Sequence, residues 1–145
     1  MDLAGNNCLD LFAGSGALGI ESLSRGASYV TFIESNQGAA KSIQENLKLL
    51  DLREGHVICT DALTWINSQG LPTKKYDVVF LDPPFSSSIL ADTCQHLDSS
   101  SLLNRACKIY IETGIDPNSL NFPQDWRRLK LKKAGQVFSS LFIKD

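Results

Sequence analysis

Short apolar runs rich in β-branched and aromatic residues alternate with helical patterns along most of this chain. The apolar runs cover residues 8–12, 29–33, 56–59, 76–81 and 108–111. The helical patterns between them cover residues 17–25, 37–50, 62–68 and 88–97. Because parallel strands need long crossover connections, which are usually helices, this alternation predicts a doubly wound α/β fold with helices on both faces of a mostly parallel sheet.

In the last part of the chain, extended runs follow each other without a helical pattern between them. Residues 126–132 and 136–143 form two extended runs separated only by Lys133-Ala134-Gly135, and a short connection that contains glycine favours an antiparallel hairpin. No internal repeat, low-complexity tract or linker interrupts the sequence. A length of 145 residues suits one hydrophobic core, so we expect a single domain over residues 1–145.

Composition excludes several classes of protein. With 43% hydrophobic residues, 21% charged residues and a net charge of -2, the chain is typical of globular proteins rather than of disordered or fibrous ones. The apolar runs are far shorter than the roughly 20 residues of a membrane-spanning helix, and the first residues lack the basic and apolar regions of a secretory signal. We therefore expect no membrane span and a cytoplasmic location.

The cysteines give no sign of a disulfide or a metal site. All four are isolated in the sequence, and the chain has only two histidines to complete a metal site. Cys8, Cys59 and Cys107 each lie in a short apolar run, where a free thiol behaves as a small hydrophobic group. We expect these three side chains to be buried.

A glycine-rich loop follows the first apolar run. Residues 14–19 read Gly-Ser-Gly-Ala-Leu-Gly and open the first helical pattern, which is the context in which such a motif binds nucleotides. Glycines allow a tight turn and close approach of a ligand, and the helix N-terminus presents free N–H groups. Glu34 comes twenty residues after Gly14, where a carboxylate can accept hydrogen bonds from ribose hydroxyls. Nicotinamide dinucleotides and S-adenosylmethionine both fit these features.

Two further carboxylates bear on the choice of cofactor. Asp10 stands just before the loop, where a negative charge suits a ligand with ammonium and sulfonium groups better than one with a pyrophosphate. Asp61 follows the third apolar run, at the edge where α/β sheets bind ligands, and could accept from an adenine amine. Asp61 could equally be the N-cap of the helix that begins near Ala62, and the two roles are compatible.

The fourth apolar run leads directly into Asp82-Pro83-Pro84-Phe85. Two prolines restrict the backbone and remove two N–H donors, so the Asp82 carboxylate and the proline carbonyls form a rim of hydrogen-bond acceptors. Such a rim suits an exocyclic NH₂ group of a nucleobase, and Phe85 offers a face on which the base could stack. Alternatively, Pro83 and Pro84 only terminate a strand and Phe85 packs in the core.

Together these segments resemble a known family. The stretch Asp-Leu-Phe-Ala-Gly-Ser-Gly-Ala-Leu-Gly-Ile-Glu at residues 10–21, combined with residues 82–85, is similar to the bacterial small-subunit ribosomal RNA guanine-N2 methyltransferases of the RsmD type. The similarity continues through residues 24–27, Glu34 and residues 134–137. It implies a Rossmann-like, seven-stranded fold of S-adenosylmethionine-dependent methyltransferases, with an antiparallel last strand.

The resemblance also implies a reaction and a site. S-adenosylmethionine would donate a methyl group to a guanine amine of 16S rRNA, and Asp82, Pro83, Pro84 and Phe85 would hold the target base. The residues expected to bind the cofactor are Asp10, Phe12, Ala13, Gly14, Ser15, Gly16, Gly19, Glu34, Ser35, Asp61 and Ala62.

One departure from the family concerns RNA binding. Its members carry a basic hairpin and a helix before the first strand, whereas this chain reaches Asp10 almost immediately. The remaining basic segment is residues 127–133. If Leu129 and Leu131 point inward, Arg128, Lys130 and Lys132 share the outer face of one strand and could contact RNA. A charged face that protects an exposed edge strand explains the pattern equally well.

Three other functions remain open from the sequence. An adenine-N6 or cytosine-N4 DNA methyltransferase needs a similar turn for an exocyclic amine. A nicotinamide-dependent reductase fits the glycine loop but leaves residues 82–85 unexplained. A non-enzymatic RNA-binding or assembly module is the third. For the methyltransferase we expect a monomer that acts on 16S rRNA, either free or within a small ribosomal subunit or its assembly intermediate.

Overall fold

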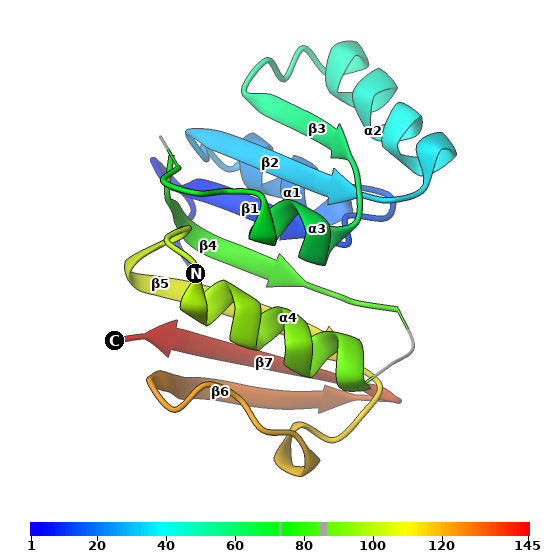
Figure 1. Cartoon of the computed structure of the whole chain (residues 1–145). Helices are drawn as coiled ribbons and strands as arrows, with labels where there is room; N and C mark the ends of the chain where they lie inside the picture. Colours follow the sequence, from blue (N-terminus) through cyan, green and yellow to red (C-terminus); the bar gives the residue numbers. More distant parts are fainter. Residues whose placement is uncertain (73, 85–86) are drawn as a thin grey trace.

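A computed structural model describes residues 1–72, 74–84 and 87–145 (Figure 1). The first half contains β1 (Asn7–Leu11), α1 (Ala17–Ser24), β2 (Tyr29–Glu34), α2 (Gln37–Leu49), β3 (Gly55–Cys59) and α3 (Ala62–Asn67). The second half contains β4 (Tyr76–Leu81), α4 (Ser87–Ser99), β5 (Leu103–Thr113), η1 (Pro117–Ser119), β6 (Trp126–Ala134) and β7 (Val137–Lys144).

The described strands form one seven-stranded sheet in the order β3-β2-β1-β4-β5-β7-β6. β1 to β5 run parallel, whereas β7 is antiparallel to β5 and to β6. The predicted α/β fold with a mostly parallel sheet and an antiparallel end is confirmed. So is the C-terminal hairpin, in which Ala134 pairs with Val137 across a tight turn.

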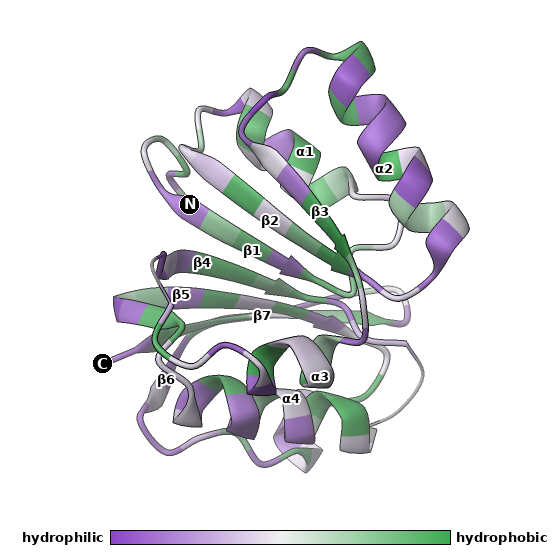
Figure 2. Cartoon of the chain, turned by 45° about the horizontal axis from the view of Figure 1, so that its top comes forward, coloured by the Kyte–Doolittle hydropathy of each residue, from purple (hydrophilic) through white to green (hydrophobic). Residues whose placement is uncertain are grey.

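The described α-helices cover both faces of the sheet, two on each face, and the two pairs lie over different parts of it. α1 and α2 lie on one face over β1, β2 and β3, and α3 and α4 lie on the opposite face (Figures 1 and 2). The spacing of Ile43 and Leu47 places both on the buried side of α2. The face of β5, β7 and β6 on the α1 side carries no described helix.

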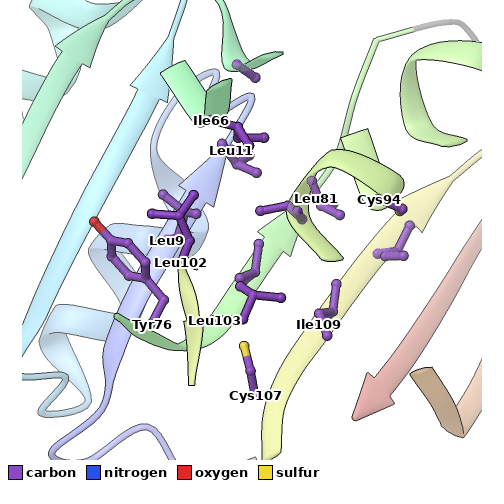
Figure 3. Packing of buried hydrophobic residues seen from close by; sticks show 14 of the residues in the cluster. Leu9, Leu11, Ile66, Tyr76, Leu81, Cys94, Leu102, Leu103, Cys107 and Ile109 are labelled. Atoms are coloured by element: carbon purple, nitrogen blue, oxygen red, sulfur yellow. The ribbon is translucent and has the colours of Figure 1, made fainter. Parts of the chain in front are cut away.

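Two hydrophobic clusters hold these layers together. The larger lies under α3 and α4 and includes Leu9, Leu81, Cys94 and Ile109, all fully buried (Figure 3). The smaller lies under α1 and α2 and includes Phe32, which is fully buried. Neighbouring residues of β1 alternate between the clusters because successive side chains of a strand point to opposite faces. The centre of the sheet is therefore buried on both sides.

Two predictions about the strands need correction. Cys59 is exposed, unlike Cys8 and Cys107, because it ends the edge strand β3. β5 begins at Leu103, five residues before the predicted run, and includes polar residues and Ala106 at φ 64°. Because this part of β5 contains polar residues, it has no continuous apolar run that would predict a strand.

The basic face predicted for β6 is also wrong in one respect. The pairing with β7 shifts between Arg128 and Lys130, so Leu129 forms a bulge and is 41% exposed. Arg128 consequently lies opposite Phe142, 5.5 Å from its ring centroid, and donates to Asn118 at 2.9 Å. Lys130 and Lys132 border a hollow beside Tyr110, on the α1 face of the sheet. Of the three basic residues predicted to share one face of β6, only Lys130 and Lys132 do so.

Across the described ranges, the helices are all too short or too polar to cross a membrane.

Candidate active site

A pocket opens at the edge of the sheet where the parallel strands end. Its volume is about 640 Å³, within the range of roughly 300–1,000 Å³ for ligand sites. It surrounds the junction of β1 and β4, where the strand order reverses and where open α/β sheets bind ligands. Twelve of the predicted site residues line it: Asp10, Phe12, Ala13, Gly14, Ser15, Glu34, Ser35, Asp61, Ala62, Asp82, Pro83 and Pro84.

Strand register brings four acidic residues to this pocket. Asp10 pairs with Phe32 on one side and with Phe80 on the other, and Phe80 pairs with Tyr110. Residues two positions further along a strand point to the same face. Glu34, Asp82 and Glu112 follow Phe32, Phe80 and Tyr110 by two positions and line the same pocket as Asp10.

Glu34, at the end of β2, ties the glycine loop to the start of α2. The Gly14 N–H donates to Glu34 Oε1 and the Asn36 N–H donates to Glu34 Oε2, both at 2.8 Å. Phe12, Gly14 and Gly16 have positive φ values of 58°, 58° and 79°, which produce the sharp turn into α1. Both oxygens of Glu34 retain lone pairs that can accept ribose hydroxyls. The loop is therefore shaped before any ligand binds.

Asp10 is a buried carboxyl group at the floor of this loop. It is 3% exposed, and its Oδ2 accepts the Gly19 N–H at 3.1 Å. The pKa of Asp10 is raised to about 7, mainly because the group is buried. The Gly19 hydrogen bond opposes this rise, and the charges of Asp82 and Glu34 add to it. A cationic ligand in the pocket would favour the ionised form.

The second half of the pocket is a rim of acceptors at the ends of β4 and β5. Partial desolvation, followed by the charge of Glu112, raises the pKa of Asp82. Glu112 Oε1 accepts the Tyr110 hydroxyl at 2.7 Å, and that hydroxyl lies 3.3 Å from Ser139 Oγ. Asp82, Pro83 and Pro84 line the pocket as the turn predicts. Phe85 lies outside the described residues.

Asp61 caps α3. Its Oδ2 accepts the Thr64 N–H at 3.1 Å and the Thr64 hydroxyl at 3.1 Å. The N-cap role considered from the sequence is thus confirmed. Asp61 also lines the pocket, and within the described residues no hydrogen bond to its Oδ1 is found.

Two predicted cofactor residues do not line the pocket. A Cβ on Gly16 would come within 3.0 Å of Ile43 Cγ1, and a Cβ on Gly19 would come within 2.2 Å of Phe32 Cε1. Both glycines therefore permit α1 to pack closely on the sheet and on α2. Both glycines shape the pocket through the position of the loop, and the Gly19 N–H also bonds to Asp10.

Comparison with known proteins identifies the family. A family model described as "Conserved hypothetical protein 95" matches residues 1–143. The "Ribosomal RNA small subunit methyltransferase D" of Escherichia coli is 34% identical over 138 residues, which cover 95% of this chain and 68% of that protein. The protein of the same name from Haemophilus influenzae is 38% identical over 94% of this chain and 71% of its own length. The chain belongs to the RsmD family.

Solved structures agree with this assignment. The yhhF protein of Escherichia coli superimposes with a TM-score of 0.92 at 32% identity, covering 99% of this chain and 79% of that one. The RsmD relatives are thus longer than the present chain by roughly a fifth to a third of their own length. The shared part contains the whole sheet and the pocket.

Sequence reasoning missed five residues that line the pocket: Ala17, Leu18, Ile33, Thr60 and Glu112. Four of them adjoin predicted residues in the chain. Glu112 does not, and no motif marks it. Its signal is its place at the carboxyl end of a parallel strand next to the strand that carries Asp82.

Proposed function

We propose that this chain binds S-adenosylmethionine and transfers its methyl group to the exocyclic N2 amine of a guanine in 16S rRNA. The observation that supports this most is the meeting, in one pocket, of the glycine loop with Glu34 and the acceptor turn of Asp82. Residues 1–145 would form one catalytic domain. It would act in the cytoplasm as a monomer on free RNA or on a small subunit or its assembly intermediate.

The glycine-loop half would hold the cofactor. Glu34 would accept the ribose hydroxyls, Asp61 the adenine amine, and Asp10 would face the cationic methionine end. Phe12, Ala13, Ser15, Ser35 and Ala62 line the same half of the pocket and would contact the cofactor there. When bound, S-adenosylmethionine supplies a methyl group activated by its sulfonium.

The Asp82 half would hold the amine. A nucleobase amine is a weak nucleophile because its lone pair is delocalised into the ring. Hydrogen bonds from its two N–H groups to Asp82 and the Pro83 carbonyl would favour the pyramidal, reactive nitrogen. That nitrogen would attack the methyl carbon as the carbon–sulfur bond breaks, leaving S-adenosylhomocysteine, and the extra proton would pass to Asp82 and then to water. Phe85 would stack on the base, a role that rests on the sequence alone.

Positioning supplies most of the rate in this scheme. Holding two reactants in attack geometry is worth about 7–11 kcal/mol. Asp82 therefore need not be a strong base; a negative charge beside the developing positive nitrogen already stabilises the transition state. Its raised pKa also suits a group that must accept a proton.

The comparisons favour RNA over the alternatives. The relatives that cover almost all of this chain are named ribosomal RNA methyltransferases, which supports an RNA substrate over DNA. A reductase would have to place a pyrophosphate beside the glycine loop, close to Asp10, where like charges repel.

Calorimetric titration tests the cofactor. The purified chain should bind S-adenosylhomocysteine and should not bind NADH at the same concentrations. Binding of NADH in place of S-adenosylhomocysteine would favour a reductase, and binding of neither would favour a non-enzymatic module.

Methyl transfer tests the substrate. The chain is incubated with labelled S-adenosylmethionine and with 16S rRNA or small subunits that lack the modification, and with duplex DNA in parallel. Nucleoside mass spectrometry should find N2-methylguanosine in the RNA. Label in DNA alone, as N6-methyladenine or N4-methylcytosine, would contradict the proposal.

A further inference from the structure

Among the charged residues that line the described pocket, Glu112 is the one to which the reaction proposed above assigns no role. It lies near the end of β5, beside the strand that carries Asp82, and is half-buried. Tyr110 holds it in place by donating its hydroxyl to Oε1 at 2.7 Å. The Tyr110 ring is itself fixed edge-on against Phe80, with ring centroids 6.2 Å apart. The position of Oε1 is thus determined by the sheet.

The other oxygen of Glu112 is available to a ligand. Within the described part of the chain, Glu112 forms no ion pair and no hydrogen bond to Oε2 is found. The carboxylate faces the same pocket as Asp82, and its charge contributes to the raised pKa of that residue. Two carboxylates at the ends of adjacent strands repel each other, so the arrangement suits a ligand with several donors.

Guanine is the base that offers such donors. Next to its N2 amine the ring carries N1–H, so the edge presents adjacent N–H groups. The ring nitrogen next to the N6 amine of adenine, or next to the N4 amine of cytosine, is an acceptor with no hydrogen. A carboxylate accepts hydrogen bonds and donates none when ionised. It attracts the edge of guanine and repels the corresponding edge of the other two bases.

We propose that Glu112 selects guanine by accepting the ring N1–H at Oε2 while Asp82 and the Pro83 carbonyl hold the N2 amine. This inference rests on the proposed function and names the base-reading group of the same site. Tyr110 is then a positioning residue that orients the carboxylate. A site built to bond an N–H group discriminates strongly against an analogue that lacks it, because its own acceptor is left unpaired.

The test compares two bases that share the reacting amine. RNA fragments carry either guanine or 2-aminopurine at the position that the wild-type chain methylates; 2-aminopurine keeps the 2-amine but has no hydrogen on N1. Wild-type kcat/KM should favour guanine by roughly 10- to 100-fold, the range of one charged hydrogen bond. In Glu112→Gln, the amide NH₂ can donate to the bare N1 of 2-aminopurine, so the preference should shrink to a few-fold or reverse.

Three controls separate base reading from structure. Glu45→Gln makes the same change at an exposed position of α2 and should leave both rates unchanged. Tyr110→Phe keeps the carboxylate and should reduce the guanine preference less than Glu112→Gln does. S-adenosylhomocysteine binding should be equal in all variants. If Glu112→Gln lowers both rates by the same factor, or if wild-type enzyme does not distinguish the two bases, the inference is wrong.

Failure of the proposed function has a different signature. If the wild-type chain produces no N2-methylguanosine but methylates adenine or cytosine, both the proposed function and the inference are wrong. If the chain transfers no methyl group to RNA, the binding of guanosine 5′-monophosphate and of 2-aminopurine riboside 5′-monophosphate to the S-adenosylhomocysteine complex is compared by NMR. Preference for the guanine nucleotide, lost in Glu112→Gln, supports base reading; equal binding to wild type overturns it.

Discussion

The two halves of the pocket differ in how far the protein already satisfies their polar groups. In the glycine-loop half, Glu34 accepts two backbone N–H groups and Asp10 accepts a third. In the other half, two prolines contribute no N–H, and the described donor to Glu112 is a single tyrosine hydroxyl. We call the glycine-loop half the braced half, because protein hydrogen bonds already hold its carboxylates. We call the Asp82 half the open half, because its acceptors are left for a substrate.

This difference suits the two tasks of a group-transfer site. A cofactor that every turnover uses is best held by a preorganised loop, because no ordering cost is incurred on binding. A substrate amine has to be activated, which requires acceptors that the protein does not occupy. Substitutions in the braced half should affect stability and cofactor affinity, and substitutions in the open half should affect turnover.

Removal of Asp82 should have the largest effect. In Asp82→Ala we expect kcat to fall about 10²- to 10³-fold, as for loss of one charge-stabilising group. The S-adenosylhomocysteine affinity and the free energy of unfolding should change little, because the residue is exposed. Single-turnover methyl transfer and calorimetry measure both quantities. Wild-type turnover by this variant would remove Asp82 from the mechanism.

The pKa of Asp10 predicts a pH dependence of stability. Burial raises this pKa from 3.8 to about 7 in the folded chain. The folded state therefore holds the proton more tightly than the unfolded state, and the stabilisation present below about pH 4 is lost as the pH rises to about 7. The slope reaches at most about 1.4 kcal/mol per pH unit.

Asp10→Asn should remove this slope. Urea unfolding at pH 4.5 to 8 compares the two proteins, and the difference between their unfolding free energies should vary below pH 7 and become constant above it. A constant difference over the whole range would mean that Asp10 titrates normally.

Gly19→Ala should damage the braced half through packing. The new Cβ would lie 2.2 Å from the ring of the fully buried Phe32. We expect the free energy of unfolding to fall by about 1–3 kcal/mol, more than alanine gains in a helix. Gly70→Ala is the control, since no described heavy atom lies within 4 Å of its Cβ position. Equal stability of the two variants would contradict the packing role.

The smallest effect is expected at Glu34. Glu34→Gln keeps one acceptor oxygen but loses the charge and one of the two backbone hydrogen bonds. We expect S-adenosylhomocysteine to bind about 10-fold more weakly, the lower range for a hydrogen bond to a charged group. Turnover at saturating cofactor should stay within a few-fold of wild type. A drop in kcat without a change in affinity would place Glu34 in the open half instead.

The fold could be predicted from the sequence wherever burial leaves a periodic apolar pattern. The central strands and α2 are such segments. The first half of β5 is not, because it is polar and contains Ala106 in a left-handed conformation. Nor does any local pattern reveal the bulge at Leu129, which depends on pairing with β7 and sends Arg128 to the other face.

The lining of the pocket was predictable where a motif joins chemistry to position, as at Asp82 and Gly14. A motif does not tell which of its glycines line a pocket and which permit close packing; Gly16 and Gly19 lie outside the pocket lining and pack against Ile43 and Phe32. Glu112 belongs to no motif, and its role depends on a neighbouring strand that is distant in sequence. Such residues become visible only when the strand order is known.

That strand order also decides when the site can exist during synthesis. β1 and β4 are neighbours, yet the bond from the Asn7 N–H to Asp77 spans 70 residues. Contacts this distant along the chain form late, because the intervening segment must be closed first. A nascent chain that has emerged only as far as β3 possesses the glycine loop and Glu34 but no acceptor turn. A chain at that stage lacks the group proposed to hold the amine, so the proposed methyl transfer would have to wait until β4 has joined β1.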